Sequence, residues 1–225
     1  MLLAIDTATE TMSIALHDGD ALAAEITLRA GRRHSALLAP LIKQTMTQAE
    51  VSLDDLSALA VSVGPGSYTG TRIGVALAKG MAAPRDLPLA PVTTLETVLA
   101  VQALRQDDPP LVATVSAGRN RVIWAEYRCE TGAWVEWRAP RISDWQALLA
   151  TCDHPIRMSG EISPAGLAAI GLAREAGARI DLAPTAQRVR RAGCLAEVAW
   201  RRLRESAGRA FPADRVMPVY LQGPA

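Results

Sequence analysis

The segment from Val61 to Ala82 constrains the fold more than any other part of the chain. Its pattern is typical of a strand (Leu59–Val63) that runs into a glycine-rich loop (Gly64–Gly70) and then a helix from about Thr71. Past its first turn this helix carries a single charge, Lys79, among apolar and small residues. A helix that is apolar on all sides has to be covered on all sides. The segment therefore predicts an α/β protein in which one face of the helix lies on its own sheet and another meets a second surface.

The glycine loop has two interpretations. Free backbone N–H groups and the positive end of a helix dipole are suited to hold an anion, and the residues that would form such a site are Gly64, Gly66, Ser67, Tyr68, Thr69 and Gly70. A Walker-type loop needs Gly-Lys-Ser/Thr, whereas Gly70 is followed by Thr71 and Arg72. A nucleophile elbow is also excluded, because the residue two before Ser67 is Pro65. A tight turn for close packing of strand and helix is therefore the favoured interpretation.

Arg72 falls in the first turn of the helix, where a cation is disfavoured by about 0.3–1 kcal/mol. An offset is expected, either from a bound anion or from a carboxylate on a neighbouring chain. A solvated arginine is the alternative.

A second helix is predicted over Ser35–Gln48, with Leu38, Leu41, Ile42, Met46 and Ala49 at helical spacing. Pro40 lies inside this run, so the helix either starts late or is kinked there. Together with the helix from Thr71 to Ala82, it could present a contiguous apolar patch of the kind that marks protein interfaces. The alternative is a fully buried pair of internal helices.

Composition excludes several classes of protein. The chain has 225 residues, 49% apolar and 21% charged, with a formal net charge of +1, so it is neither a disordered chain nor one attracted to nucleic acid by overall charge. No apolar stretch approaches a membrane span, and the start, Met1–Asp6, does not resemble a signal peptide. With three widely spaced cysteines, we expect a cytoplasmic protein with no membrane partner.

Metal and nucleophile chemistry has little local support. The three histidines (His17, His34 and His154) are scattered, and no CxxC pair is present, so no metal site and no cofactor are predicted. The C-terminal region is locally basic, which is typical of a solvated helix face and less often of an RNA-facing patch. Its arginines are Arg188, Arg190, Arg191, Arg201, Arg202 and Arg204.

Strands followed by helices occur twice along the chain, which suggests two similar α/β units. The first unit is predicted to span residues 1–105, beginning with three antiparallel strands around an Asp18-Gly19 turn. The second is predicted to span residues 106–225. Further helices are predicted after caps at Thr93 and Glu96 (running to about Arg105), after caps at Ser143 and Gln146, from Ser163-Pro164, and from about Gly193 to Ala207. The tail after about residue 212 is expected to pack back on the first unit.

Three blocks resemble a known family. They are Leu3 to Thr9, the His34-Ser35 pair with Leu38, Pro40 and Ile42, and above all Gly64-Pro65-Gly66-Ser67-Tyr68-Thr69-Gly70-Thr71-Arg72-Ile73-Gly74. The chain resembles the TsaB (YeaZ) family, partner subunits in the biosynthesis of threonylcarbamoyladenosine on tRNA. Trp124 to Tyr127 and Pro218 to Leu221 extend the likeness over nearly the whole chain.

The resemblance implies a two-lobed fold of the actin, Hsp70 and sugar-kinase class (ribonuclease H-like), with mixed sheets and helices. It implies a non-catalytic subunit that dimerises with the catalytic paralogue TsaD, helps recruit the ATPase TsaE, and meets tRNA only indirectly. A homodimer through the same helices is a further expectation. The implied interface residues are His34, Ser35, Leu38, Leu41, Ile42, Arg72, Ile73, Val75, Ala76, Lys79 and Gly80.

The same resemblance supplies a rival interpretation, a small ATPase or kinase-like enzyme, or a peptidase. Asp6 and Thr7 match the first phosphate loop of such enzymes, so a vestigial nucleotide or anion loop is expected there. The second phosphate loop reads Val115-Ser116-Ala117-Gly118 and lacks the aspartate of the ATPases. The paired-histidine helix of the catalytic paralogues is reduced to His34 alone. Both departures favour a partner protein over an enzyme.

Overall fold

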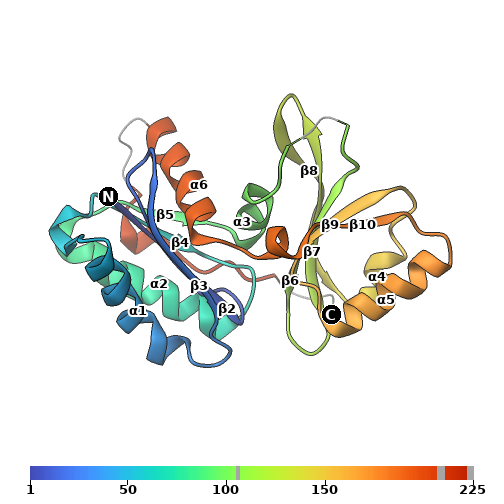
Figure 1. Cartoon of the computed structure of the whole chain (residues 1–225), viewed down its shortest axis with the longest axis horizontal. Helices are drawn as coiled ribbons and strands as arrows, with labels where there is room; N and C mark the ends of the chain where they lie inside the picture. The colour runs from blue at the N-terminus through green and yellow to red at the C-terminus, as the bar shows by residue number, and fades with distance from the viewer. Residues whose placement is uncertain (105–106, 207–210, 222–225) are drawn as a thin grey trace. The chain divides into compact units, whose positions relative to one another are not determined.

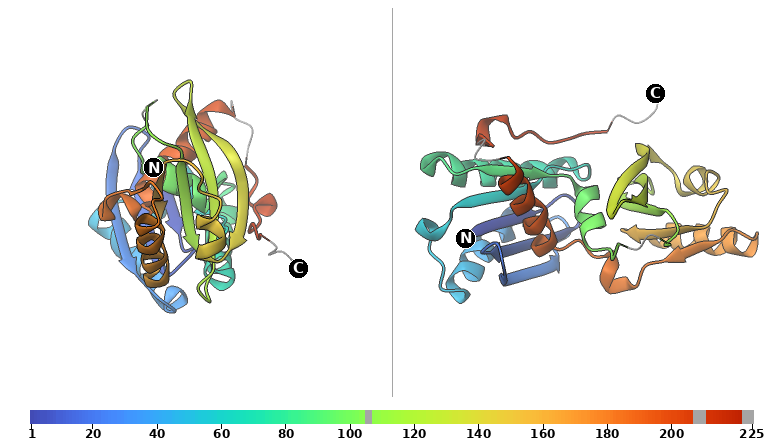
Figure 2. Two further views of the ribbon diagram at one scale, coloured as in Figure 1. Left: turned by 90° about the vertical axis from the view of Figure 1, so that its right-hand side faces the viewer. Right: turned by 90° about the horizontal axis from the view of Figure 1, so that it is seen from above.

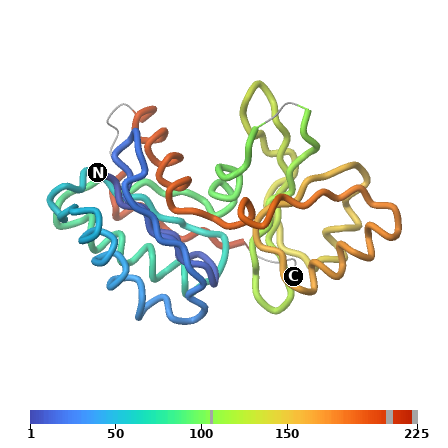
Figure 3. The backbone as a smooth tube through the Cα atoms, in the orientation of Figure 1, coloured from blue at the N-terminus to red at the C-terminus, as the bar shows by residue number. Residues whose placement is uncertain are grey.

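The structure, a computed structural model, describes residues 1–104, 107–206 and 211–221. These residues form two α/β units, labelled in Figure 1. Unit 1 combines Met1–Ala100 with Arg190–Tyr220, and unit 2 is built mainly from Val101–Val189. The chain therefore leaves unit 1 once and returns to it, a path that Figure 3 traces from blue-green through yellow to red.

Unit 1 contains a five-stranded sheet in the order β3-β2-β1-β4-β5. Its strands are β1 (Leu2–Asp6), β2 (Thr11–His17), β3 (Leu22–Arg29), β4 (Ala58–Ser62) and β5 (Leu89–Val92). The first three strands are antiparallel, as the Asp18-Gly19 turn predicts, whereas β4 and β5 run parallel to β1. Parallel strands need a crossover connection, and two helices provide it: α1 (His34–Gln48) leads towards β4, and α2 (Tyr68–Ala82) joins β4 to β5.

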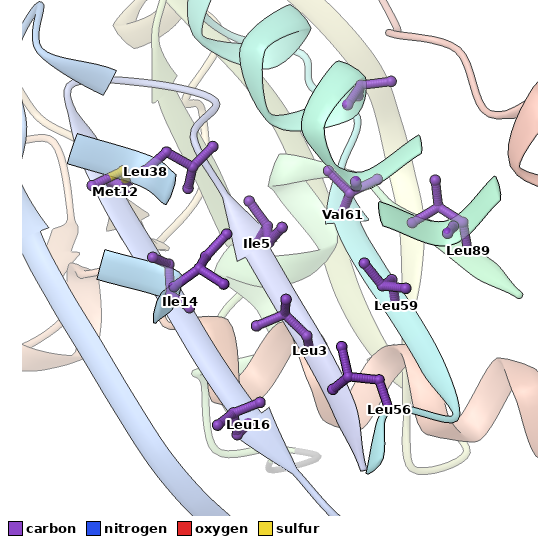
Figure 4. Close-up of a cluster of buried hydrophobic side chains, with 14 of the residues drawn as sticks. Leu3, Ile5, Met12, Ile14, Leu16, Leu38, Leu56, Leu59, Val61 and Leu89 are labelled. Carbon is purple, nitrogen blue, oxygen red and sulfur yellow. The ribbon is translucent and has the colours of Figure 1, made fainter. Parts of the chain in front are cut away.

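The two faces of this sheet are built from side chains of different size. The large side chains alternate along the strands and form one buried cluster with side chains of α1 and α2. Figure 4 shows Leu3 and Ile5 of β1 and Leu59 and Val61 of β4 in this cluster, together with Leu38 of α1. The opposite face is lined by small side chains, chiefly Ala4, Ala15, Ala58, Ala60 and Ala90. Two helices lie on that side, α6 (Ala192–Glu205) and the short α3 (Thr94–Ala100). Alanine has no bulk beyond Cβ, so α6 approaches the sheet closely.

Unit 2 repeats this arrangement. Its sheet has the order β10-β9-β6-β7-β8, with β6 antiparallel to β7 and parallel to β9. The strands are β6 (Leu111–Ser116), β7 (Val122–Glu130), β8 (Ala133–Ser143), β9 (Ile156–Gly160) and β10 (Ile180–Leu182). Helices α4 (Trp145–Leu149) and α5 (Pro164–Glu175) pack on one face around Trp124 and Met158. Four short 3-10 turns complete the two units: η1 (Leu53–Asp55), η2 (Ala83–Arg85), η3 (Thr185–Arg188) and η4 (Ala213–Arg215).

The structure has two α/β units, in agreement with the predicted two-lobed fold. From the sequence, the second lobe was drawn as residues 106–225, with the tail after about residue 212 packing back on the first, whereas all of Arg190–Tyr220 groups with unit 1. The reason is packing, because Leu195 and Ala199 of α6 lie in the same buried cluster as the alanines of the first sheet. Figure 2 shows α6 in red-orange against the blue and teal strands of that sheet.

Two helix boundaries also differ from the sequence prediction. The helix after Thr93 ends at Ala100, whereas it was predicted to reach Arg105, a residue outside the described part of the chain. Pro40 neither delays nor ends α1, which is continuous from His34 to Gln48. Pro40 has no backbone N–H, so the carbonyl of Ala36, four residues earlier, loses its helical hydrogen bond. Ala36 is exposed, so water is able to bind this carbonyl instead. Within the described residues, every helix is too short or too polar to cross a membrane.

Candidate functional site: the docking face and the closed loop of unit 1

The glycine loop packs its backbone directly on the turn between β1 and β2. Ser67 N donates a hydrogen bond to the carbonyl oxygen of Ala8 at 2.6 Å. A Cβ atom at Gly66 would collide with that same carbonyl, and one at Gly70 would collide with the carbonyl of Thr7. Glycine is therefore required here by the close approach of two backbone segments, which accords with the turn interpretation of the loop.

Asp6, the candidate for a vestigial phosphate loop, is buried in an ion pair. Arg190 Nε donates to Asp6 Oδ2 at 2.9 Å, and both side chains are 1% exposed. Arg190 Nη2 donates to Thr9 Oγ1 at 2.7 Å, and the other carboxylate oxygen of Asp6 accepts from Ala8 N at 2.9 Å. The carboxylate of the expected phosphate loop is thus paired with an arginine of the same chain.

Thr7, the other candidate in this loop, is also engaged within unit 1. Its hydroxyl donates to the carbonyl of Gly70 at 2.8 Å, and the residue is fully buried. Ser67 Oγ accepts from Gly70 N at 3.1 Å and caps α2, which begins at Tyr68 rather than at Thr71 as predicted. The cap fixes the start of α2 against the β1–β2 turn.

The interface residues expected on α1 and α2 fall into two groups. His34, Leu38, Ile42 and Val75 are buried in unit 1, so they offer little surface to a partner, contrary to the expectation from the sequence. The physical reason is the helical period, which places these four against the sheet. The remaining residues are exposed or half-buried, and we call them, with the half-buried Leu37 and Leu77 beside them, the docking face. Its members from the prediction are Ser35, Leu41, Arg72, Ile73, Ala76, Lys79 and Gly80.

Along α2 the exposed part of the docking face is lined by small residues. Ala76 is exposed, and a Cβ atom built at Gly80 would meet nothing within 4 Å. Beside it, a groove of about 450 Å³ runs between α1 and α2 and includes Leu53, Leu77 and Met81 in its lining. Leu53 is 42% exposed. The surface is apolar, shallow and accessible to a second helix.

Arg72 lies between two tyrosine side chains. Its Nε donates to the hydroxyl oxygen of Tyr220 at 2.8 Å, and its guanidinium carbon lies 3.8 Å from the ring centroid of Tyr68. The two rings are 5.1 Å apart. The offset expected for a cation at this position thus includes two aromatic rings of the same chain, which the sequence interpretation of Arg72 did not foresee.

The C-terminal segment is fixed along α2. Lys79 Nζ donates to the carbonyl oxygens of Asp214 and Val216, at 3.0 and 3.1 Å, and Val219 N donates to the carbonyl of Val63 at 2.7 Å. The right-hand view of Figure 2 shows this red segment passing along the teal helix. Lys79, predicted to face a partner, therefore holds the chain's own tail.

The basic C-terminal region is not a uniform solvated or RNA-facing surface. Arg190 is buried against Asp6, and Arg202 is paired with Glu96 and with the carbonyl of Pro91. Arg191 is paired with Glu25, and Arg204 donates to the carbonyl of Gly19 at 2.7 Å. Most of these guanidinium groups tie α6 to the first sheet.

Unit 2 contains a polar cluster that the sequence did not reveal. Glu126 is only 1% exposed as a residue, and its carboxylate lies 2.6 Å from His154 Nε2 and 3.3 Å from Arg138 Nε. The other ring nitrogen of His154 lies 2.6 Å from Asp153, and this hydrogen bond lowers the pKa of Asp153. Arg138 and His154 thus both contact the buried carboxylate of Glu126. In the described residues, no group of three or more His, Cys, Asp or Glu is arranged to hold a metal ion.

Cys152 beside this cluster is expected to react slowly with alkylating reagents. Burial, with the nearby Glu126 carboxylate, raises the pKa of its thiol from 9.0 to about 11. At pH 8 the reactive thiolate is then about a hundredfold scarcer than for an ordinary cysteine. Mass spectrometry of iodoacetamide-treated protein should show Cys152 modified far more slowly in the folded than in the urea-unfolded chain. Equal rates in the two states would contradict the buried environment.

Comparison with known proteins places these features in a family. The family model described as "TsaD: tRNA N6-adenosine threonylcarbamoyltransferase" matches residues 27–141. The "tRNA threonylcarbamoyladenosine biosynthesis protein TsaB" of Escherichia coli is 39% identical over 134 residues, which cover 59% of this chain and 58% of that protein. The Bacillus subtilis protein of the same name is 34% identical over 163 residues, 71% of this chain and 70% of that protein. The chain thus spans little more than half of the first relative.

The fold has a solved counterpart over its whole length. The structure "YeaZ from Pseudomonas aeruginosa" superposes with a TM-score of 0.73, at 24% sequence identity, and covers 98% of this chain and 99% of its own. At this identity the likeness shows the fold, a two-lobed α/β arrangement.

Proposed function

The chain belongs to the TsaB (YeaZ) family, and from this premise we propose that it is a non-catalytic subunit required for threonylcarbamoyladenosine modification of tRNA. In this role it dimerises with a TsaD-like catalytic subunit, and the pair helps recruit a TsaE-like ATPase. The tRNA is met through the assembly and not by α6, in which Arg202 and Arg204 are engaged within the chain.

The observation that carries this proposal is the docking face. Helix α2 leaves Ala76 and Gly80 exposed on a surface whose half-buried neighbours, Leu37, Leu41 and Leu77, are apolar. Small exposed residues let a second helix approach closely, and a contiguous apolar patch of this kind is typical of an interface. The whole surface lies within unit 1.

The state of Asp6 supports the non-catalytic part of the proposal. Asp6 is buried and bonded to Arg190 and Ala8, so its carboxylate is not accessible to a nucleotide. The glycine loop is likewise filled by the backbone of Thr7 and Ala8. Purified alone, the chain should show no ATP or peptide turnover above a buffer blank, and measurable turnover would favour the rival enzyme.

Replacing Gly80 with arginine is expected to abolish the heterodimer while leaving unit 1 folded. Nothing lies within 4 Å of a Cβ at this site, so the side chain fits the free protein but obstructs a partner helix. Mixing each variant with the TsaD-like subunit of the same organism, followed by size-exclusion chromatography with light scattering at micromolar concentration, measures the effect. The matched control is Gly171→Arg on α5, an equally open helical glycine in unit 2, which should form the heterodimer normally.

Two outcomes would overturn the proposal. Absence of a heterodimer with the wild-type chain would remove the partner role altogether. A Gly80→Arg variant that is folded by circular dichroism and still forms the heterodimer would remove the docking face. If the free chain forms a homodimer through the same helices, the substitution should convert it to a monomer in the same experiment.

A further inference from the structure

We propose that Arg72 is the charged anchor of the docking face and pairs with a carboxylate side chain of the partner protein. The inference rests on the proposed function, because it names the chemistry by which that face recognises its partner. It is carried by the arrangement of Arg72 between Tyr68 and Tyr220.

The guanidinium group of Arg72 is exposed yet held in place. Its Nε is bonded to the hydroxyl of Tyr220, and its carbon lies 3.8 Å from the Tyr68 ring centroid and 5.7 Å from that of Tyr220. A free arginine at a surface loses much rotamer freedom when a partner binds. Here that freedom is already restricted in the free protein, so the group is preorganised for binding.

The tyrosine that fixes Arg72 is itself fixed by the backbone. Residue 219, next to Tyr220, donates its N–H to Val63 at the end of β4. A Cβ atom at residue 64 would lie 2.7 Å from the carbonyl oxygen of Val219. Gly64 also has a φ of +94°, which favours glycine. Three residues before Val219, Val216 is buried in the core of unit 1. The position of Tyr220 is therefore set by the packing of unit 1.

The chemistry of the site selects an anion with planar geometry. The bond to Tyr220 uses Nε, and in the described part of the chain it is the one hydrogen bond of this guanidinium, so the terminal nitrogens remain for a ligand. A carboxylate accepts two such donors at once.

The surroundings favour a protein carboxylate over an RNA phosphate. The large exposed side chains at the start of α2 and along the tail are aromatic or apolar, namely Tyr68 (56%), Met217 (65%), Val219 (40%) and Tyr220 (42%), and the small polar Ser67 and Thr69 are exposed with them. Tyrosine, methionine and arginine are enriched at the centres of protein interfaces. Phosphate-binding surfaces gather several cations, whereas Lys79 nearby is bonded to carbonyls of the tail. Arg72 is also in the same helix as Ala76 and Gly80 of the docking face.

Arg72→Gln is expected to weaken the heterodimer at least about tenfold and to reduce the salt dependence of its Kd. Isothermal titration against the TsaD-like subunit at about 50 and about 300 mM salt measures both. Tyr220→Phe removes the hydrogen bond but keeps the ring, so an intermediate loss is expected. The matched control is Arg201→Gln on α6, also an exposed arginine, which should bind like the wild type.

The outcomes separate this inference from the proposed function. If the wild-type chain does not bind, the proposed function fails. If it binds and Arg72→Gln binds equally well with the same salt dependence, the anchor role alone is overturned. If Arg72→Gln lowers the affinity of the chain for tRNA and leaves the heterodimer unchanged, the ligand is a phosphate and the inference is again overturned. Arg72→Glu should be rescued by reversing one acidic residue of the partner, and a complete reversal scan without rescue would exclude a carboxylate.

Discussion

Replacing Arg190 with methionine is expected to lower the free energy of unfolding of the protein by about 3–5 kcal/mol. The substitution leaves Asp6 with an unpaired carboxylate at a site where both side chains are 1% exposed. Burial of a charge without a partner costs several kcal/mol, because neither water nor a counter-ion replaces the lost interaction. Urea denaturation at constant pH, followed by circular dichroism, measures the change.

Two further variants distinguish the lost ion pair from a general packing defect. In the double variant Asp6→Asn with Arg190→Met the charge is removed from both sides, so at least half of the lost stability should return. Arg191→Met is the control, because this neighbouring arginine is half-exposed, and Glu25, although 9% exposed, keeps the hydrogen bond from Gly193 N when Arg191 is removed. It should cost about 1 kcal/mol or less. An Arg190→Met variant as stable as Arg191→Met would contradict the assigned role of the buried pair.

Replacing Gly70 with alanine is expected to destabilise unit 1 by about 1–3 kcal/mol or more, although alanine is the better helix former. A Cβ atom at this position would collide with the backbone carbonyl of Thr7, which is fixed in the turn between β1 and β2. The backbone has to move to admit it, and the hydrogen bond from Thr7 Oγ1 to Gly70 O would be strained as well. Thermal and urea unfolding of the purified variant measure the effect.

The matched control is the same substitution in the same helix. Gly80→Ala places a methyl group in open space, so the helix should gain about 1 kcal/mol from the better propensity of alanine. The two variants are therefore expected to shift the unfolding midpoint in opposite directions. A Gly70→Ala protein that is as stable as Gly80→Ala would show that the glycine loop is not held against the β1–β2 turn.

Short sequence patterns predicted a helix start correctly where its cap involves only neighbouring residues. The Ser163-Pro164 start of α5 was predicted from sequence, and Ser163 Oγ accepts from Gly166 N as a helix cap should. The cap of α4 shows the limit of this reasoning. Ser143 was the candidate, but its hydroxyl accepts from Trp124 Nε1, and the actual cap is Asp144, which accepts from Ala147 N. The hydroxyl of Ser143 is occupied by Trp124 of the distant strand β7 and by the carbonyl of Asp144, so it does not cap α4.

Most of what was missed depends on pairs that are far apart in the chain. The partner of Asp6 is 184 residues away, and that of Arg72 is 148 residues away. Nothing in the run of arginines distinguishes Arg190, which is buried, from Arg201, which is exposed. The burial of α6 on the first sheet was missed for the same reason, because an alanine-lined face carries little hydrophobic signal.

The docking face was partly predictable because helical spacing is a local property. Spacing identified both helices, and the apolar character of α2 indicated a second contact surface. It did not identify which residues face inward, since nearly every position of α2 is apolar or small. The inward face of α2 is set by packing on the sheet, which buries Val75 and leaves Ala76 and Gly80 exposed.

The return of the chain to unit 1 at Arg190 has a consequence for protein synthesis. The first sheet is complete once residue 92 has been made, but α6, which covers its alanine-lined face, is synthesised about a hundred residues later. On the ribosome, at about 5–20 residues per second, that face stays uncovered for several seconds. The sheet and helices of unit 2 all lie within Val101–Val189, so they do not wait for a later segment. Because small side chains line this uncovered face, the nascent chain exposes less apolar surface than a leucine-lined sheet would, and is less prone to aggregate.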